Sequence, residues 1–110
     1  MGTMIERSER FLLRVGIAND EDVALAGRHV RQLAQLEGFS ESRRDDLVAA
    51  VAEVARSIAV EGGGEILLGL THDEGRHGIV VLSRVTAADG VVVRMKKWLA
   101  RDPNPVLRSV

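Results

Sequence analysis

The chain has 110 residues, enough for one domain with a single hydrophobic core. Its composition, 45% hydrophobic and 28% charged, is ordinary for a globular protein and argues against disorder. With 15 basic and 16 acidic side chains the net charge is -1, which predicts no strong attraction to nucleic acids or membranes. The chain has no cysteine, which excludes a disulfide framework and a thiolate metal site and fits a reducing cytoplasm.

Residues 1–10 are polar and carry charges of both signs, so we interpret them as an N-terminal tail and expect no signal peptide. The longest apolar run, around residues 79–82, is far too short to span a membrane. The aromatic residues are too few for a nucleic-acid reader that stacks on bases: Phe11, Phe39 and Trp98. We therefore expect a cytoplasmic protein with no nucleic-acid or membrane partner.

The first half of the chain predicts one strand followed by one helix. Residues 11–17 resemble a strand, although their alternation is only partly kept. Residues 20–37 predict an amphipathic helix, with Asn19 or Asp20 as its N-cap and Gly38 as its stop. The apolar positions that carry this helical period are Val23, Ala26, Val30, Leu33 and Ala34.

A second helix is predicted to begin at Ser40 or Ser42 and to end at the three glycines of residues 62–64. These glycines could also form a phosphate loop. Phosphate loops precede a helix, however, and these follow one, so we interpret them as a helix stop. The expected core positions of this helix are Leu47, Val51, Val54 and Ile58.

The remainder predicts strands joined by short turns, at residues 73–76 and at the Asp89-Gly90 pair. Pro103 and Pro105 break regular structure, so residues 102–110 are interpreted as a C-terminal tail and residues 11–101 as a single domain. The predicted strands are residues 65–71, 78–85 and 91–99. The order predicts an α+β fold: a two-layer sandwich with two helices packed on one face of a mainly antiparallel four-stranded sheet.

Glu53 and Ser57 are four residues apart, so they share one side of the second helix, at the border of its apolar stripe. A carboxylate in that place could orient a water molecule or hold a metal ion. It could equally be a surface carboxylate paired with a neighbour such as Arg56.

Several segments resemble the GHKL ATPase superfamily, most closely its RsbT-like anti-sigma switch kinases of bacterial stress signalling. The resemblance rests chiefly on residues 50–58 (AVAEVARSI) and 90–99 (GVVVRMKKWL). Residues 27–30 (GRHV), 38–40 (GFS) and 63–66 (GGEI) add to it. It implies a serine/threonine kinase fold in which Glu53 activates the attacking group and the position of Ser57 helps to hold magnesium.

The same resemblance shows what this sequence lacks. The family has an asparagine where Ser57 stands and an adenine-reading aspartate where Val85 stands. Asp89-Gly90 could be a displaced remnant of that motif, but a hairpin turn is the simpler interpretation. The chain then passes directly into its last strand, which leaves no segment for a glycine-rich ATP lid or for the helix whose N-terminus faces the phosphates. We therefore expect a truncated, partial GHKL-like fold, with Glu53 and Ser57 as vestigial cofactor-binding residues and no bound ATP or magnesium.

The function expected from this reasoning is a non-catalytic protein-interaction domain of partner-switching signalling. By resemblance, its partner would be a STAS-domain antagonist or a sigma factor. The partner-binding candidates are Arg28 and Arg31 of the first helix and Arg94 and Lys96 of the last strand. The basic residues of the last strand could instead only discourage edge pairing. The alternatives are an active ATP-dependent serine kinase that uses Glu53, and a structural subunit of an oligomer.

The histidines, the serines and several apolar helix residues are further candidates for function. His72, Asp73 and His77 bracket a turn and could converge on a metal, but solvated turn residues are the simpler interpretation, and we expect no metal site. No serine lies in a nucleophile motif. With the lid absent, Ala49, Ala52 and Val60 could be exposed apolar surface, from which we expect a homodimer or a second protein as partner.

Overall fold

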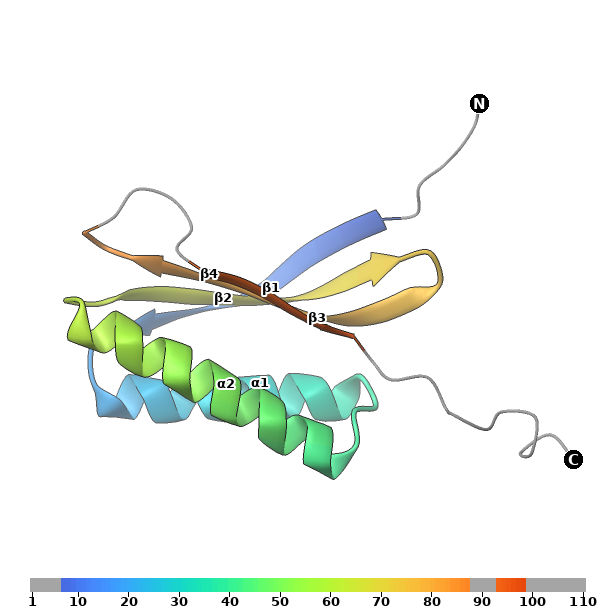
Figure 1. Cartoon of the computed structure of the whole chain (residues 1–110), viewed down its shortest axis with the longest axis horizontal. Helices are drawn as coiled ribbons and strands as arrows, with labels where there is room; N and C mark the ends of the chain where they lie inside the picture. The colour runs from blue at the N-terminus through green and yellow to red at the C-terminus, as the bar shows by residue number, and fades with distance from the viewer. Residues whose placement is uncertain (1–6, 88–92, 99–110) are drawn as a thin grey trace, which may run out of the picture.

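The computed structural model of the chain describes residues 7–87 and 93–98, and within them two helices and four strands (Figure 1). The elements in chain order are β1 (Arg7–Ile17), α1 (Asp20–Leu36), α2 (Glu41–Val60), β2 (Gly64–Asp73), β3 (Arg76–Val85) and β4 (Val93–Trp98).

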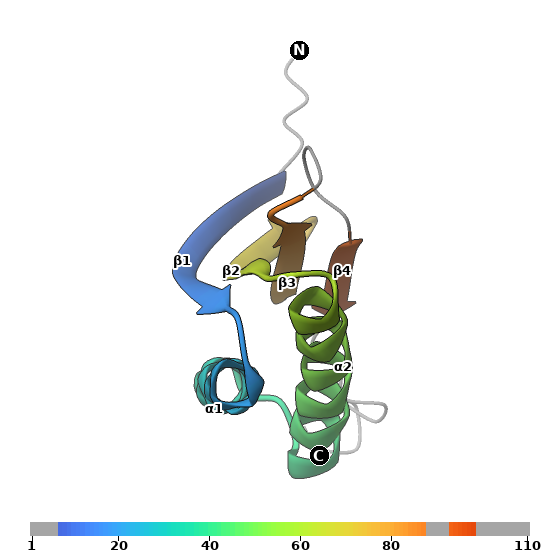
Figure 2. The same ribbon diagram turned by 90° about the vertical axis from the view of Figure 1, so that its left-hand side faces the viewer.

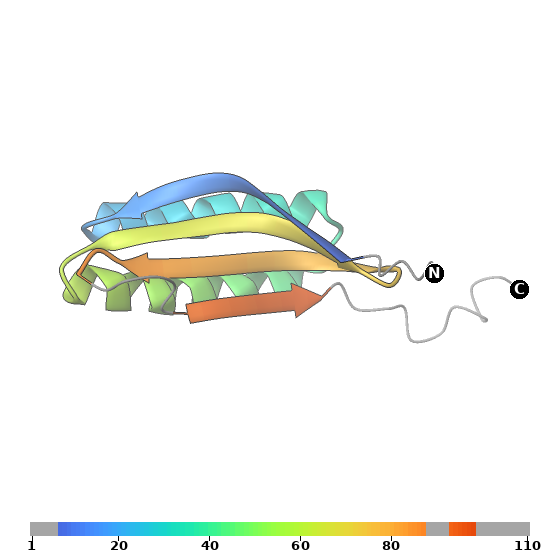
Figure 3. The same cartoon turned by 90° about the horizontal axis from the view of Figure 1, so that it is seen from above.

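The four strands form one sheet in the order β1-β2-β3-β4, and every neighbouring pair is antiparallel (Figure 3). Both helices lie side by side under one face of this sheet (Figure 2). The predicted two-layer α+β sandwich is therefore confirmed, and its sheet is antiparallel throughout.

Helix α1 begins with a reciprocal cap. The Asn19 side chain accepts a hydrogen bond from the Asp22 amide at 3.0 Å, and the Asp22 carboxylate accepts one from the Ala18 amide at 2.8 Å. The helix ends before Gly38, whose φ of 88° is the left-handed conformation expected of a stop. All five predicted core positions are buried: Val23, Ala26, Val30, Leu33 and Ala34.

Helix α2 begins at the Ser40 cap, where the serine hydroxyl accepts from the Arg43 amide at 3.3 Å. It ends at the glycines, because Gly62 and Gly63 have φ near 102° and 103°, a region that favours glycine. Three predicted core positions, Leu47, Val51 and Ile58, are buried. The fourth, Val54, is partly buried and packs against the core, and Ala55 is a further fully buried position.

The core lies between the helices and the sheet. From the strands come Val15, Ile17, Ile66, Leu68, Ile79 and Val81, which pack on the helix residues already named and on Phe39. Alternation along each strand places these side chains on one face, so the sheet has a single core-facing side.

Three strands are longer than predicted. β1 begins at Arg7, so its first four residues belong to the strand and not to a tail. Within β1, Phe11 pairs with Gly69 and Leu13 with Leu68, which makes Leu12 the extra residue of a β-bulge. β2 and β3 extend to Asp73 and Arg76, so that only Glu74 and Gly75 form the turn, both with positive φ.

The face of the sheet away from the helices is covered by long charged side chains. The Glu65 carboxylate forms ion pairs with Arg14 at 3.6 Å and with Arg84 at 3.5 Å. Lys96 of β4 forms an ion pair with Glu9 of β1 at 3.0 Å. The last pair bridges two outer strands of the sheet. Two apolar residues of β3 on this face, Val80 and Leu82, are nevertheless buried.

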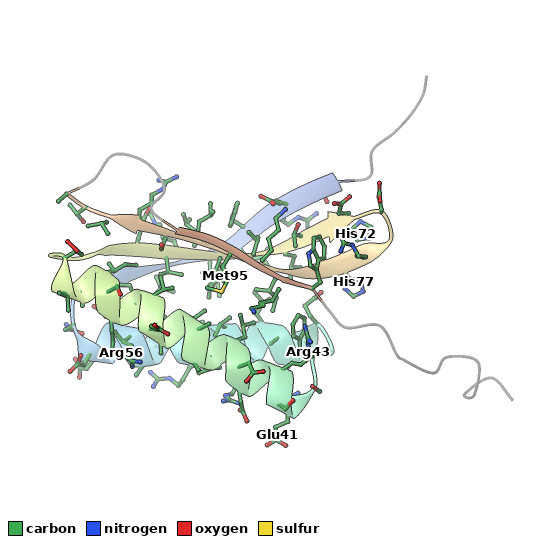
Figure 4. The ribbon with its side chains drawn as sticks, viewed as in Figure 1. Glu41, Arg43, Arg56, His72, His77 and Met95 are labelled. Carbon is green, nitrogen blue, oxygen red and sulfur yellow. The ribbon has the colours of Figure 1, made fainter. Side chains whose placement is uncertain are left out.

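Strand β4 is held at its end by the start of α2. The Arg43 guanidinium donates to the Trp98 carbonyl oxygen at 2.6 Å and lies 5.7 Å from the centre of the Phe39 ring (Figure 4). The predicted turn at Asp89-Gly90, which joins β3 to β4, lies outside the described residues, as does the predicted tail at 102–110.

Neither described helix combines the length and the hydropathy that crossing a membrane requires.

The glycine at position 69 is required by close backbone packing. A Cβ on Gly69 would overlap the carbonyl oxygen of Arg10 and lie 2.8 Å from the Cα of Phe11. We therefore predict that Gly69→Ala lowers the free energy of unfolding by about 1–3 kcal/mol in chemical denaturation. The matched control is Gly16→Ala, where a Cβ meets nothing within 4 Å, and it should change stability by no more than about 0.5 kcal/mol. Equal effects of the two substitutions would contradict this interpretation.

Candidate functional site

The first candidate site is a groove of about 700 Å³ between α2 and the β3–β4 side of the sheet. It contains both residues of the predicted motif, Glu53 and Ser57. Met95 of β4 points into it from the sheet (Figure 4). The other lining residues are Ala50, Val54, Ile58, Glu61, Ser83, Val85 and Ala87.

Glu53, Ser57 and Glu61 form one row along α2, because residues four apart lie above one another on a helix. All three are exposed at the rim of the groove, while Ser83 is buried on the sheet side. The geometry thus brings Glu53 and Ser57 to one cavity, as their four-residue spacing predicts, and adds a second carboxylate.

The charges around this groove oppose a triphosphate. Its described lining includes two carboxylates, Glu53 and Glu61, and no basic side chain. Glu61 also marks the end of α2, where the helix dipole presents its negative pole. The three glycines follow this end and give no helix N-terminus to receive a phosphate.

Val85 stands where the resemblance would require an adenine-reading aspartate. Val85 lines the groove, where its apolar side chain cannot accept the hydrogen bond of an exocyclic amine. The described residues therefore provide a largely apolar groove with an acidic rim.

The second candidate site is a groove of about 580 Å³ between α1 and α2. No strand residue lines it, which places it on the outer side of the helical layer. Its rim includes three arginines, Arg28 and Arg31 from α1 and Arg56 from α2. Figure 4 shows Arg56 extending from α2 on the side of α1. The rest of its lining is Asp20, Val23, Ala24, Gly27, Val48 and Ala52.

The three arginines differ in their partners. Arg31 bonds Asp45 of α2 at 2.8 Å, an ion pair that joins the two helices. Arg28 and Arg56 are exposed, and no ion pair or hydrogen bond links either of them to another described residue. The two cations that border this apolar floor are therefore available to a ligand.

Arg56 was not among the partner-binding residues expected from the sequence. A signal for it exists, since Val48, Ala52 and Arg56 are four residues apart and share one face of α2. That face forms one wall of a groove because α1 packs beside it, and the sequence of α2 alone does not contain this contact.

The predicted partner-binding residues do not form one surface. Arg28 and Arg31 lie on the helical layer, whereas Lys96 lies on the opposite face of the sheet and bonds Glu9. Its ammonium group is also 5.7 Å from the centre of the Trp98 ring. Arg94 belongs to β4, and its side chain lies outside what the structure describes.

The histidines do not make a metal centre. His72 and His77 lie directly opposite each other on β2 and β3, with ring centres 6.4 Å apart (Figure 4). His77 Nδ1 is 3.5 Å from a carboxylate oxygen of Glu37, and Asp73 is 3.8 Å from Arg76 instead. Across the described parts of the chain, no group of three histidine or acidic side chains is arranged to hold a metal ion.

No protein-family model, curated protein or solved structure matches this chain. The resemblance to switch kinases is thus carried by the sequence motifs alone.

The acidic groove generates a prediction about nucleotide binding. Isothermal titration with Mg-ATP should show millimolar affinity or none, because carboxylates and a helix C-terminus face the space that the phosphates would occupy. Glu53→Gln should not weaken any residual binding, since the substitution removes a repulsive charge. Micromolar binding that is lost in Glu53→Gln would overturn this result and favour an active kinase.

Proposed function

We propose that this chain is a cytoplasmic, non-catalytic protein-interaction domain that binds an acidic segment of a partner protein. The observation that carries the proposal is the arginine-bordered groove between α1 and α2. The partner classes suggested by the resemblance, a STAS-domain antagonist or a sigma factor, remain the proposed ones.

The composition of this groove supports protein binding. Arginine is enriched in protein interfaces because its planar guanidinium forms directed hydrogen bonds with carboxylates. The small floor residues Ala24, Gly27 and Ala52 allow a partner side chain to approach the helix backbones closely. An apolar floor with a polar rim is the usual anatomy of such an interface.

The charge of the groove selects an acidic partner. Three arginines border it, of which Arg31 is paired with Asp45, and Asp20 is the acidic residue of the lining. The chain as a whole carries a net charge of -1. The groove is therefore locally basic on a nearly neutral protein. Such a patch steers acidic partners and contributes more to association rate and specificity than to stability of the complex.

We predict that the double variant Arg28→Gln/Arg56→Gln loses its partner. The chain, immobilised and exposed to native cytoplasm, should retain a specific protein, and the variant should retain it at least about tenfold less, as expected for two interface arginines. Binding should weaken as salt is raised, because the exposed charges are screened.

The matched control is Arg76→Gln/Arg84→Gln, which removes the same charge from β3, in the sheet. It should retain the partner. If the control loses the partner and the groove variant keeps it, binding occurs on the sheet and the proposal is wrong.

Two alternatives stay open. An ATP-dependent kinase would use Glu53 in the acidic groove, and the nucleotide titration separates it from our proposal. A purely structural subunit would form an oligomer with no acidic partner. Light scattering, together with the partner experiment above, distinguishes that case.

A further inference from the structure

Strand β1 exposes three large apolar residues in succession. Phe11 is 38% exposed, Leu12 46% and Leu13 38%. They lie on an outer strand of the sheet, paired with β2 on one side only. The opposite side of this 11-residue strand therefore presents backbone N–H and C=O groups together with an apolar cluster, a combination that favours pairing with another strand.

The other sheet edge is unlike this one. β4 has six residues, and three of them are basic: Arg94, Lys96 and Lys97. Short length and repeated cations are the features by which natural sheets prevent edge pairing. β4 thus has the features that prevent edge pairing, and the centre of β1 lacks them.

We propose that β1 pairs antiparallel with β1 of a second copy of this chain, around a two-fold axis between Phe11 and Leu12, to form a continuous eight-stranded sheet. An isologous contact of this kind needs a surface that is complementary to itself. Both the bulge and the charges of β1 meet this requirement in one register.

The bulge restricts which registers are possible. Residues directly opposite in an antiparallel pair share a face of the sheet. Val15 and Leu13 lie on the helix face, and Arg14 on the other face. Because Leu12 is an extra residue, the alternation shifts by one, which places Arg10 on the helix face and Glu9 on the open face. Helix-face residues are therefore even-numbered before the bulge and odd-numbered after it. A residue before the bulge can lie opposite one after it in the second copy only when their two residue numbers add to an odd number.

The charged side chains of β1 favour one of these registers. With Phe11 opposite Leu12 of the second copy, Glu9 lies opposite Arg14 of the second copy, on the same face. Arg14 is 70% exposed although it lies 3.6 Å from Glu65, and Glu9 also pairs with Lys96, so the contact between copies would add to these existing ion pairs on the open face. Moving the register by two residues in one direction places Arg14 opposite Phe11, and in the other direction places it opposite Arg7. The proposed register is the one that pairs opposite charges and places the exposed Phe11 and Leu12 opposite each other at the axis.

A second copy also fits better than an unrelated strand, because both the acceptor and the donor of the proposed ion pairs come from β1 itself. Among the described residues, the remaining exposed large apolar side chains are Leu36 at 82% and Val60 at 86%, each at a helix end. The predicted self-association surface at Ala49, Ala52 and Val60 is therefore replaced in this proposal by β1.

The first test is the mass in solution. Light scattering coupled to size exclusion should give twice the 12.0 kDa of the chain. Leu12→Lys should shift the protein to the monomer mass, because a charge at the axis opposes pairing. Val60→Lys, a control at a more exposed apolar residue outside the sheet, should stay dimeric, and circular dichroism should show both variants folded. A monomeric wild type, or a dimer broken by Val60→Lys and not by Leu12→Lys, would overturn the proposal.

The second test reads the register and does not depend on Leu12→Lys folding. The chain has no cysteine, so single cysteines report without background. A mixture of Phe11→Cys and Leu12→Cys chains should cross-link to each other under mild oxidation in preference to themselves, since opposite residues lie within disulfide reach. Leu36→Cys should not cross-link. Equal cross-linking at all three positions indicates random collision and rejects the proposed pairing.

Discussion

Burial of one sheet face against two helices is the constraint on which the rest of the structure depends. Strand residues such as Ile66 and Ile79 meet helix residues such as Val30 and Val51, and all four are fully buried. Because there are only two layers, the second sheet face and the outer sides of both helices are not covered by another layer. The sheet face carries long ion pairs such as Glu9 with Lys96, and the helical layer carries the arginines around its groove.

Much of this fold could be predicted from the sequence because helical periodicity and glycine positions are local signals. The five apolar positions of α1 and the left-handed Gly38 are examples. The start of β1 could not, because residues 7–10 are polar and join the sheet through contacts such as that of Glu9 with β4. The rotation of α2, which buries Ala55 fully and Val54 partly, is likewise set by the sheet and not by the helix itself.

The candidate sites likewise combine features that local sequence patterns predict with features that depend on tertiary packing. The spacing of Glu53 and Ser57 predicted that they share a side of α2, and they line one groove. The charge of that groove depends on Glu61 and on the direction of the helix, which become relevant only after the sheet is placed opposite. Arg56 joins Arg28 and Arg31 through the packing of two helices, a tertiary contact that single-helix periodicity does not contain.

The hydrogen bond from Arg43 to the Trp98 carbonyl joins the last residue of the final described strand to the first turn of α2. An outermost strand ordinarily loosens from its free end, one residue at a time. Here the first residue to leave would abandon a charged donor whose Nε already has no hydrogen-bond partner among the described residues. Loosening of the strand at Trp98 therefore costs this hydrogen bond as well, which couples the end of the sheet to the beginning of the helix.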